Sequence, residues 1–150
     1  MDRQRLGERI AVFFMTMAMV IAFPYIITML LNGRATDCEQ QLKEIHTGRD
    51  VIVQCEGKNT LMDVEQYIVR VLPGFVNDTA KSDVIKAQAV ALRTKIYFEM
   101  GNDTVIDAKK LGMTYYSDAD YVSKYGSKGY RQIKRAYEQA VLDTLQETIE

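Results

Sequence analysis

The sequence has few of the residues on which many catalytic and nucleic-acid-binding proteins depend. It contains one histidine, His46, in 150 residues, so a histidine-based catalytic triad or zinc site has little material. Its 19 basic and 20 acidic residues give a net charge of −1, without the basic excess of a nucleic-acid-binding domain. The glycine patterns of dinucleotide and phosphate loops, GxGxxG and GxxxxGKS/T, are absent. We therefore expect no metal site, no cofactor and no nucleic-acid partner.

A long uncharged run stands near the N-terminus. Residues 10–31, with the sequence IAVFFMTMAMVIAFPYIITMLL, contain no charged side chain. At about 1.5 Å per residue, a helix of this length spans roughly 33 Å, enough for the hydrocarbon core of a bilayer. Pro24 is tolerated there, because transmembrane helices accept proline more readily than soluble ones. A buried core helix is the alternative, but so long a run has no polar face. We predict a transmembrane helix over residues 10–31.

The charges beside this run predict its orientation. Arg3, Arg5 and Arg9 precede it, whereas only Arg34 follows closely and acidic residues come soon after. The positive-inside tendency places residues 1–9 in the cytoplasm and the rest of the chain outside. A cleaved signal peptide is the alternative, but its apolar region is usually about 7–15 residues and ends in small residues, unlike LLNGRATDC here. We favour an uncleaved signal-anchor in a single-pass protein of the cell membrane.

Both cysteines follow the apolar run. Residues 32–50 are expected to form a linker or stalk, with a short helix as one interpretation of CEQQLKEI. Under the predicted topology, Cys38 and Cys55 lie outside the membrane, where an oxidising environment permits a disulfide. The bridge would close a loop of about 18 residues. The sequence leaves two interpretations open, a disulfide and two separate thiols.

Hydrophobic spacing and turn residues predict a mainly helical α+β domain over residues 51–150. The β-branched run at residues 51–55 predicts a strand. Asp63 is a suitable N-cap for a helix that continues to about Leu72, where a Pro-Gly pair ends or bends it. Apolar spacing predicts further helices at residues 83–100, near 118–125 and at about 129–148.

The central helix combines an apolar face with a second strip of small side chains. Ser82 is its expected N-cap and Gly101 its C-terminal stop. A strip of small residues lets another backbone approach closely, so we expect this helix to be packed on two sides. The apolar face comprises Ile85, Ala89, Leu92, Ile96 and Met100, and the small strip comprises Ala87, Ala91 and Thr94.

Tyrosines are concentrated in the segment between the predicted central helix and the last predicted helix. One use of such a cluster is stacking on sugar rings. The other, which we favour, is packing of this segment onto the helices around it. The tyrosines are Tyr115, Tyr116, Tyr121, Tyr125 and Tyr130.

One part of the sequence resembles a known family. The run VEQYIVRVLPGFVNDTAKSDVIKAQAVALRTKIY, residues 64–97, resembles the stage II sporulation protein D domain, which also occurs in amidase-enhancer proteins of Gram-positive bacteria. That domain has roughly the pattern EEYLxGVVAAEMP, about nine variable residues, then KAQAVAARTY. KAQAVALRT matches nearly letter for letter, and the separation of Tyr67 from Lys86 agrees without a gap. The later LGMTYYSDADYVSKYG and YRQIKRAYEQAVLDT look like the family's next loop and helix, so the resemblance covers about residues 51–150.

The resemblance implies chemistry on the cell wall. Family members that act as enzymes are lytic transglycosylases, which cleave peptidoglycan glycan strands stripped of stem peptides during sporulation. A glutamate in the AAEMP segment is the implied acid/base, since one carboxyl group of raised pKa can protonate the glycosidic oxygen and later deprotonate a sugar hydroxyl. Ungapped alignment from Tyr67 places Phe75 at that glutamate. Asp78 is a weak candidate to replace it, and Asp83 more plausibly caps the central helix.

A second departure from the family pattern is the extent of the domain. The family domain usually continues past its AVxxTxG helix into a strand-rich half with an HSTSGG-type motif, whereas this sequence closes with LDTLQETIE. We expect either that another polypeptide supplies that half or that this protein does not cleave glycans.

The resemblance and its departures lead to three hypotheses. The leading one is a membrane-anchored, catalytically silent module that binds peptidoglycan glycan or a cell-wall hydrolase complex. The alternatives are an active lytic transglycosylase completed by a partner chain, and a bitopic scaffold that docks another protein. The central helix, which contains KAQAVALRT and is called the signature helix below, offers candidate binding residues. The alternative interpretation is that these residues only tie the helix to neighbouring loops. These residues are Lys86, Gln88, Arg93, Thr94 and Tyr97.

Overall fold

The computed structural model describes residues 15–17, 19–20, 22–24, 26, 41–55 and 57–149. The chain divides into two units, Met1–Asp37 and Cys38–Glu150. The transmembrane helix predicted at residues 10–31 falls largely outside the described residues. Among those that are described, no helix has both the length and the apolar character needed to cross a bilayer. Cys38 lies outside the described residues as well, and so does the predicted disulfide.

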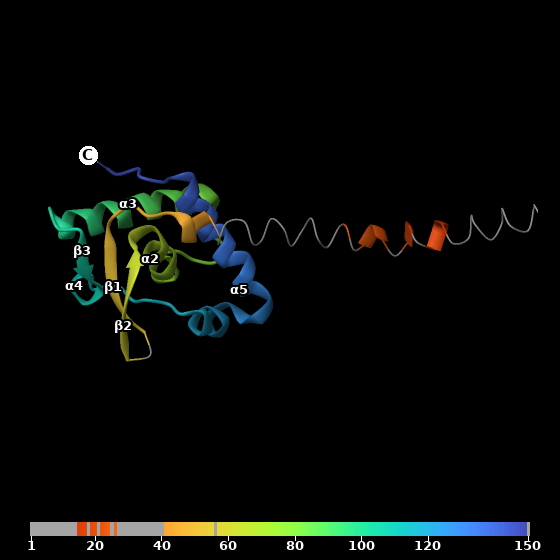
Figure 1. Ribbon diagram of the computed structural model, residues 1–150, viewed down its shortest axis with the longest axis horizontal. Helices are drawn as coiled ribbons and strands as arrows, with labels where there is room; N and C mark the ends of the chain where they lie inside the picture. Colours follow the sequence, from red (N-terminus) through yellow and green to blue (C-terminus); the bar gives the residue numbers. More distant parts are fainter. Residues whose placement is uncertain are drawn as a thin grey trace, which may run out of the picture. The chain divides into compact units, whose positions relative to one another are not determined.

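The second unit contains a three-stranded sheet with the order β2-β1-β3 (Figure 1). Strand β1 (Asp50–Cys55) pairs antiparallel with β2 (Lys58–Asp63) and parallel with β3 (Val105–Asp107). The strand predicted at residues 51–55 is therefore confirmed as β1. The other two strands were not predicted, because most side chains of β2 are exposed and β3 has only three residues, so neither shows an apolar alternation.

The first two helical elements follow β2 directly. Helix α2 (Val64–Val71) begins after Asp63, whose carboxylate accepts a hydrogen bond of 2.9 Å from the Glu65 amide. The Pro-Gly pair then forms the short 3-10 helix η1 (Leu72–Gly74). Both features confirm the predicted cap and the predicted end of this helix.

Helix α3 (Ser82–Met100) is the predicted central helix, one residue longer at its start. Gly101 follows it with φ of 57°, a backbone conformation that glycine adopts without strain, so the predicted stop is confirmed. The predicted cap is wrong: Lys81 is the N-cap, without a side-chain hydrogen bond, and Ser82 is already helical.

The C-terminal third forms α4 (Ala108–Leu111) and α5 (Asp118–Asp143). Helix α5 contains the two helices predicted near residues 118–125 and 129–148, joined across a kink at Gly126 with φ 75° and ψ 160°. It ends earlier than predicted, and a short turn-rich segment follows it.

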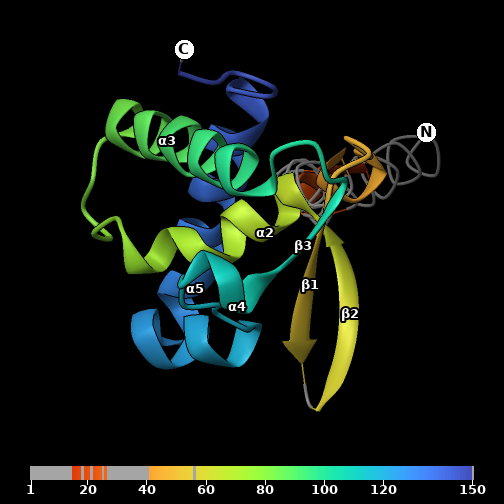
Figure 2. The same cartoon turned by 90° about the vertical axis from the view of Figure 1, so that its left-hand side faces the viewer.

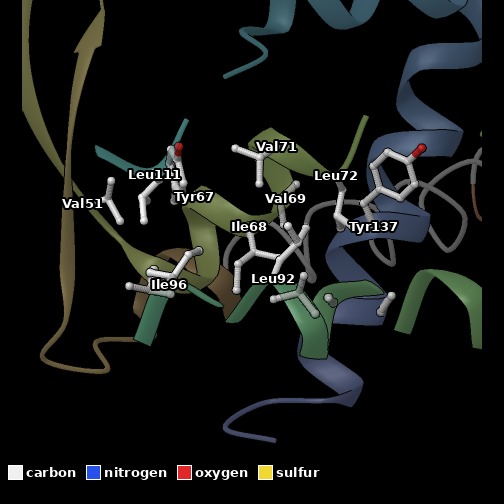
Figure 3. Close-up of a cluster of buried hydrophobic side chains, with 14 of the residues drawn as sticks. Val51, Tyr67, Ile68, Val69, Val71, Leu72, Leu92, Ile96, Leu111 and Tyr137 are labelled. Carbon is white, nitrogen blue, oxygen red and sulfur yellow. The ribbon is translucent and has the colours of Figure 1, made fainter. Parts of the chain in front are cut away.

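Helix α2 is the centre of the core. It contacts both long strands, α3 and α5, and in Figure 1 it lies between the sheet and α5. The view in Figure 2 shows the β1–β2 hairpin extending away from the helices. Figure 3 shows the buried side chains of α2 between Val51 and Leu111 at one end and Tyr137 at the other. Burial of such apolar surface is the main stabilising contribution to a domain of this kind.

Helix α3 buries the predicted apolar face but not the predicted small strip. Each residue from Ile85 to Met100 on that face is at most 5% exposed. Ala87, in contrast, is exposed, while Ala91 and Thr94 are only partly buried. The expectation that the small strip is packed is therefore wrong for Ala87, and the second buried contact of α3 is made by Arg93 instead.

The tyrosine-rich segment packs onto α2 and α5. The buried Tyr121 hydroxyl donates a hydrogen bond of 2.5 Å to the Val69 carbonyl, and the Tyr115 ring stacks on the Tyr67 ring at 6.5 Å between centroids. Tyr125 and Tyr137 both lie beside Tyr121, with ring centroids 5.8 and 6.3 Å away. These contacts confirm the packing role that we favoured for the cluster.

Candidate functional site

The most polar feature of the interior is an ion pair between α2 and α3. Arg93 donates from Nε to Glu65 Oε1 over 2.7 Å and from Nη2 to Glu65 Oε2 over 2.6 Å. Both side chains are fully buried. The remaining guanidinium nitrogen, Nη1, donates to the Glu147 carbonyl over 3.0 Å. Arg93 thus joins α2, α3 and the segment after α5 in one hydrogen-bond network.

The local structure explains why these two charged side chains can be buried as a pair. Glu65 lies in the first turn of α2, where the helix dipole favours a negative charge. A buried charge is tolerated when it is paired and fully hydrogen-bonded, and the bidentate geometry satisfies both carboxylate oxygens. This contact was not predicted, because 28 residues separate the partners. The position of Arg93 beside the apolar face of its helix was the available signal.

The other candidate residues of the signature helix also have partners within the domain. Lys86 Nζ lies 2.7 Å from Asp143 Oδ2 at the end of α5, and this hydrogen bond raises the pKa of Lys86 and lowers that of Asp143. Thr94 Oγ1 accepts from the Ile149 amide over 2.9 Å. The Arg49 guanidinium covers the Tyr97 ring, 4.4 Å from its centroid.

These candidate residues do not form one binding surface. Gln88 is half-buried and lies two residues beyond Lys86, about 200° around a helix. Arg93 is inaccessible, and Thr94 holds the C-terminal segment, which runs alongside α3 in Figure 1. The contacts of this set therefore hold elements together, and a binding role for it stays a prediction.

Phe75, the residue predicted to stand at the position of the family's glutamate, lies where the chain leaves η1. Its amide donates to the Leu72 carbonyl over 2.9 Å, while its side chain is 48% exposed. Side chains from later in the chain hold the turn that precedes Phe75. Lys124 donates a hydrogen bond to the Pro73 carbonyl, and the Tyr116 ring packs on Gly74. A fixed backbone therefore presents a half-exposed aromatic ring to solvent.

The two carboxyl groups that follow Phe75 most closely in the sequence are not buried acids. Asp78 and Asp83 are both exposed, and Asp83 lies in the first turn of α3 rather than at its cap. Glu65 is buried, but both of its oxygens accept hydrogen bonds from Arg93. Within the described ranges, no three His, Cys, Asp or Glu side chains come together as a metal site.

Comparison with known proteins identifies the family. The family model described as stage II sporulation protein (SpoIID) matches residues 56–150. This range contains strands β2 and β3, the helical elements from α2 to α5, the Glu65–Arg93 pair and Phe75. No curated protein and no solved structure matches the chain. The chain therefore belongs to the SpoIID family of stage II sporulation proteins, a family linked to sporulation and in general to lytic action on the cell wall.

Proposed function

We propose that this protein is a non-catalytic member of its family that binds peptidoglycan glycan strands at the cell envelope without cleaving them. The observation that carries the proposal is Phe75, half-exposed at the position where the family pattern has its acid/base glutamate. Glycan cleavage of this type needs a side chain that gives and takes a proton beside the glycosidic oxygen. A phenyl ring has no proton to exchange.

Glu65 and Asp78 do not supply a replacement. Both oxygens of Glu65 are occupied by Arg93, in a position without access to solvent. Asp78 is exposed, three residues further along the loop. The family's carboxyl group therefore has no counterpart at its own position in this chain.

The surface around Phe75 has the composition of a sugar-binding surface. An aromatic ring can cover the apolar face of a sugar ring, and polar groups around it can bond the hydroxyls. Asn77, Asp78 and Thr79 are all exposed in the loop that follows the ring. This arrangement favours retention of a glycan over its hydrolysis.

Sedimentation with purified peptidoglycan tests the binding. We expect the full chain, kept in mild detergent, to sediment with peptidoglycan, and Phe75→Ser to weaken its affinity about two- to tenfold, the effect of losing one aromatic contact. The matched control is Leu61→Ser, which removes a 62% exposed apolar side chain from β2 and should leave sedimentation unchanged. No sedimentation of the wild type would favour a protein partner instead, and equal losses in both variants would remove Phe75 from the binding surface.

The proposal includes the orientation expected from the uncharged run at residues 10–31, with residues 51–150 outside the cell membrane. Ser123 is exposed on α5, so Ser123→Cys can report the side on which the domain lies. In a Cys38→Ser, Cys55→Ser background, a membrane-impermeant thiol reagent should label this cysteine in intact cells. Labelling only after lysis would contradict the proposed location.

A further inference from the structure

A cation lies beside the turn that carries Phe75. Lys124, in the first part of α5, donates a hydrogen bond from its ammonium group to the carbonyl of Pro73, two residues before Phe75. Two residues of an extended chain span at most about 7 Å. This hydrogen bond therefore holds the ammonium group close to the aromatic residue that we propose as the sugar contact.

Two tyrosine rings also hold Lys124 in this position. Its Nζ atom lies 5.0 Å from the centroid of the Tyr116 ring and 5.5 Å from the centroid of the Tyr125 ring. At these distances the face of an aromatic ring attracts a cation. Both tyrosines are only partly buried, so the cation and the two rings belong to one accessible region of the surface.

The same part of the chain contacts the residues on both sides of Phe75. The Tyr116 ring packs on Gly74, with its nearest atom 3.5 Å from where a Cβ would stand. On the other side, the Tyr137 hydroxyl donates a hydrogen bond of 3.4 Å to the Val76 carbonyl. Phe75 is therefore part of a surface that it shares with the tyrosine-rich segment.

Lys124 has no acidic partner within the described part of the chain. An ammonium group can donate three hydrogen bonds, and the Pro73 carbonyl accepts one from Lys124. Asp120, one helical turn earlier, accepts instead from the amide and the hydroxyl of Ser117 over 2.8 and 2.6 Å. Asp78, in the loop after Phe75, is exposed and makes no ion pair with Lys124. An anchored cation whose charge is not neutralised is suited to bind an anionic group.

We propose that Lys124 binds a carboxylate carried by the glycan whose sugar ring lies on Phe75, so that this surface selects an acidic strand over a neutral one. The inference rests on the proposed function and specifies the chemistry of its ligand. In peptidoglycan, the muramic acid sugar carries such a carboxylate on its lactyl group wherever no stem peptide is attached. A strand of N-acetylglucosamine alone is uncharged and offers the ring contact only. A hydrogen bond from an ammonium group to a carboxylate is stronger than one between neutral groups.

Two forms of one ligand that differ only in charge test this selection. Both are peptidoglycan glycan strands without stem peptides, one with free lactyl carboxylates and the other with these groups converted to methyl esters. Binding to the full chain in mild detergent is measured by the fluorescence anisotropy of end-labelled strands. We expect the wild type to bind the acid form about tenfold more tightly than the ester, the effect of one charge-assisted contact.

Variants of Lys124 assign the preference to its charge. Lys124→Gln should remove the preference and leave binding of the ester unchanged, because glutamine can still donate to the Pro73 carbonyl, whereas Lys124→Arg should keep the preference. The matched control, Lys95→Gln, removes an exposed cation from α3 and should leave the preference intact. Equal binding of both forms by the wild type, or a preference that persists in Lys124→Gln, would overturn this inference alone. Binding of neither form would overturn the proposed function, and this inference with it.

Discussion

Among individual residues, the buried polar side chains differ in whether the fold gives them partners. Glu65 and Arg93 satisfy each other completely. Tyr67, two residues after Glu65 in α2, is fully buried, and within the described part of the chain its hydroxyl has no hydrogen-bond partner. Burial raises the pKa of Tyr67 to about 12.

Tyr67→Phe should therefore be neutral or stabilising, because it removes a hydroxyl that folding desolvates without compensation. Tyr121→Phe is the matched comparison. It removes the donor to the Val69 carbonyl and should cost about 1–3 kcal/mol by leaving a buried acceptor unpaired. Urea denaturation of the two variants decides the ranking, and a greater loss for Tyr67→Phe would mean that its hydroxyl has a partner.

The raised pKa of Tyr67 predicts that the unfolding free energy falls at alkaline pH. A tyrosine whose folded pKa is raised contributes stability that is complete below its unfolded pKa of about 10 and is lost as the pH rises toward 12. The advantage of Tyr67→Phe over wild type should thus be constant up to about pH 10 and grow above it. Unfolding free energies measured at about pH 8 and pH 11 test this, and a pH-independent difference would refute it.

Arg93 should be far more important for stability than Lys86, although both belong to the signature helix. Arg93→Met leaves Glu65 buried without its counter-charge, which typically costs about 3–5 kcal/mol. Lys86→Met removes only a surface ion pair with Asp143, and such pairs contribute little. Chemical denaturation of each variant checks the contrast. Similar small effects from both would show that the interior pair is not needed for folding.

Among the structural elements, α5 depends on one glycine. Gly126 has φ 75° and ψ 160° at the kink, a conformation nearly restricted to glycine. Gly126→Ala should destabilise the domain by about 1–3 kcal/mol, whereas Gly129→Ala should stabilise it by about 0.5–1 kcal/mol, because the added Cβ would meet only an ordinary contact with Tyr125. Thermal unfolding of both variants measures this, and a stable Gly126→Ala protein would show that α5 can straighten.

The elements also show what the sequence could predict. Strand β1, α2 and α3 were predicted from their apolar or β-branched spacing, together with the Asp63 cap of α2 and the Gly101 stop of α3. The cap predicted for α3 was wrong. Strands β2 and β3 were missed because tertiary pairing, not an apolar pattern, forms them. At the candidate site, the assignment of Phe75 to the position of the family's glutamate stays a prediction. The internal role of Arg93 and Thr94 depends on contacts across 28 to 55 residues, which no local pattern contains.

At the scale of the whole molecule, the signature helix serves mainly to hold the domain together. Its inner face packs on α2, Arg93 and Thr94 fix the C-terminal segment, and Lys86 joins α5. The proposed glycan contact, Phe75 at the end of η1, lies outside this set of internal contacts.

The most direct test of this account is whether the full chain turns over glycan strands from which the stem peptides have been removed. The products of lytic cleavage carry a 1,6-anhydro ring and can be detected by mass spectrometry. Because we propose that Phe75 stands in place of the acid/base glutamate, we predict that the wild-type chain binds these strands and releases no anhydro product. Release of anhydro sugars by the purified wild-type chain would contradict the central claim.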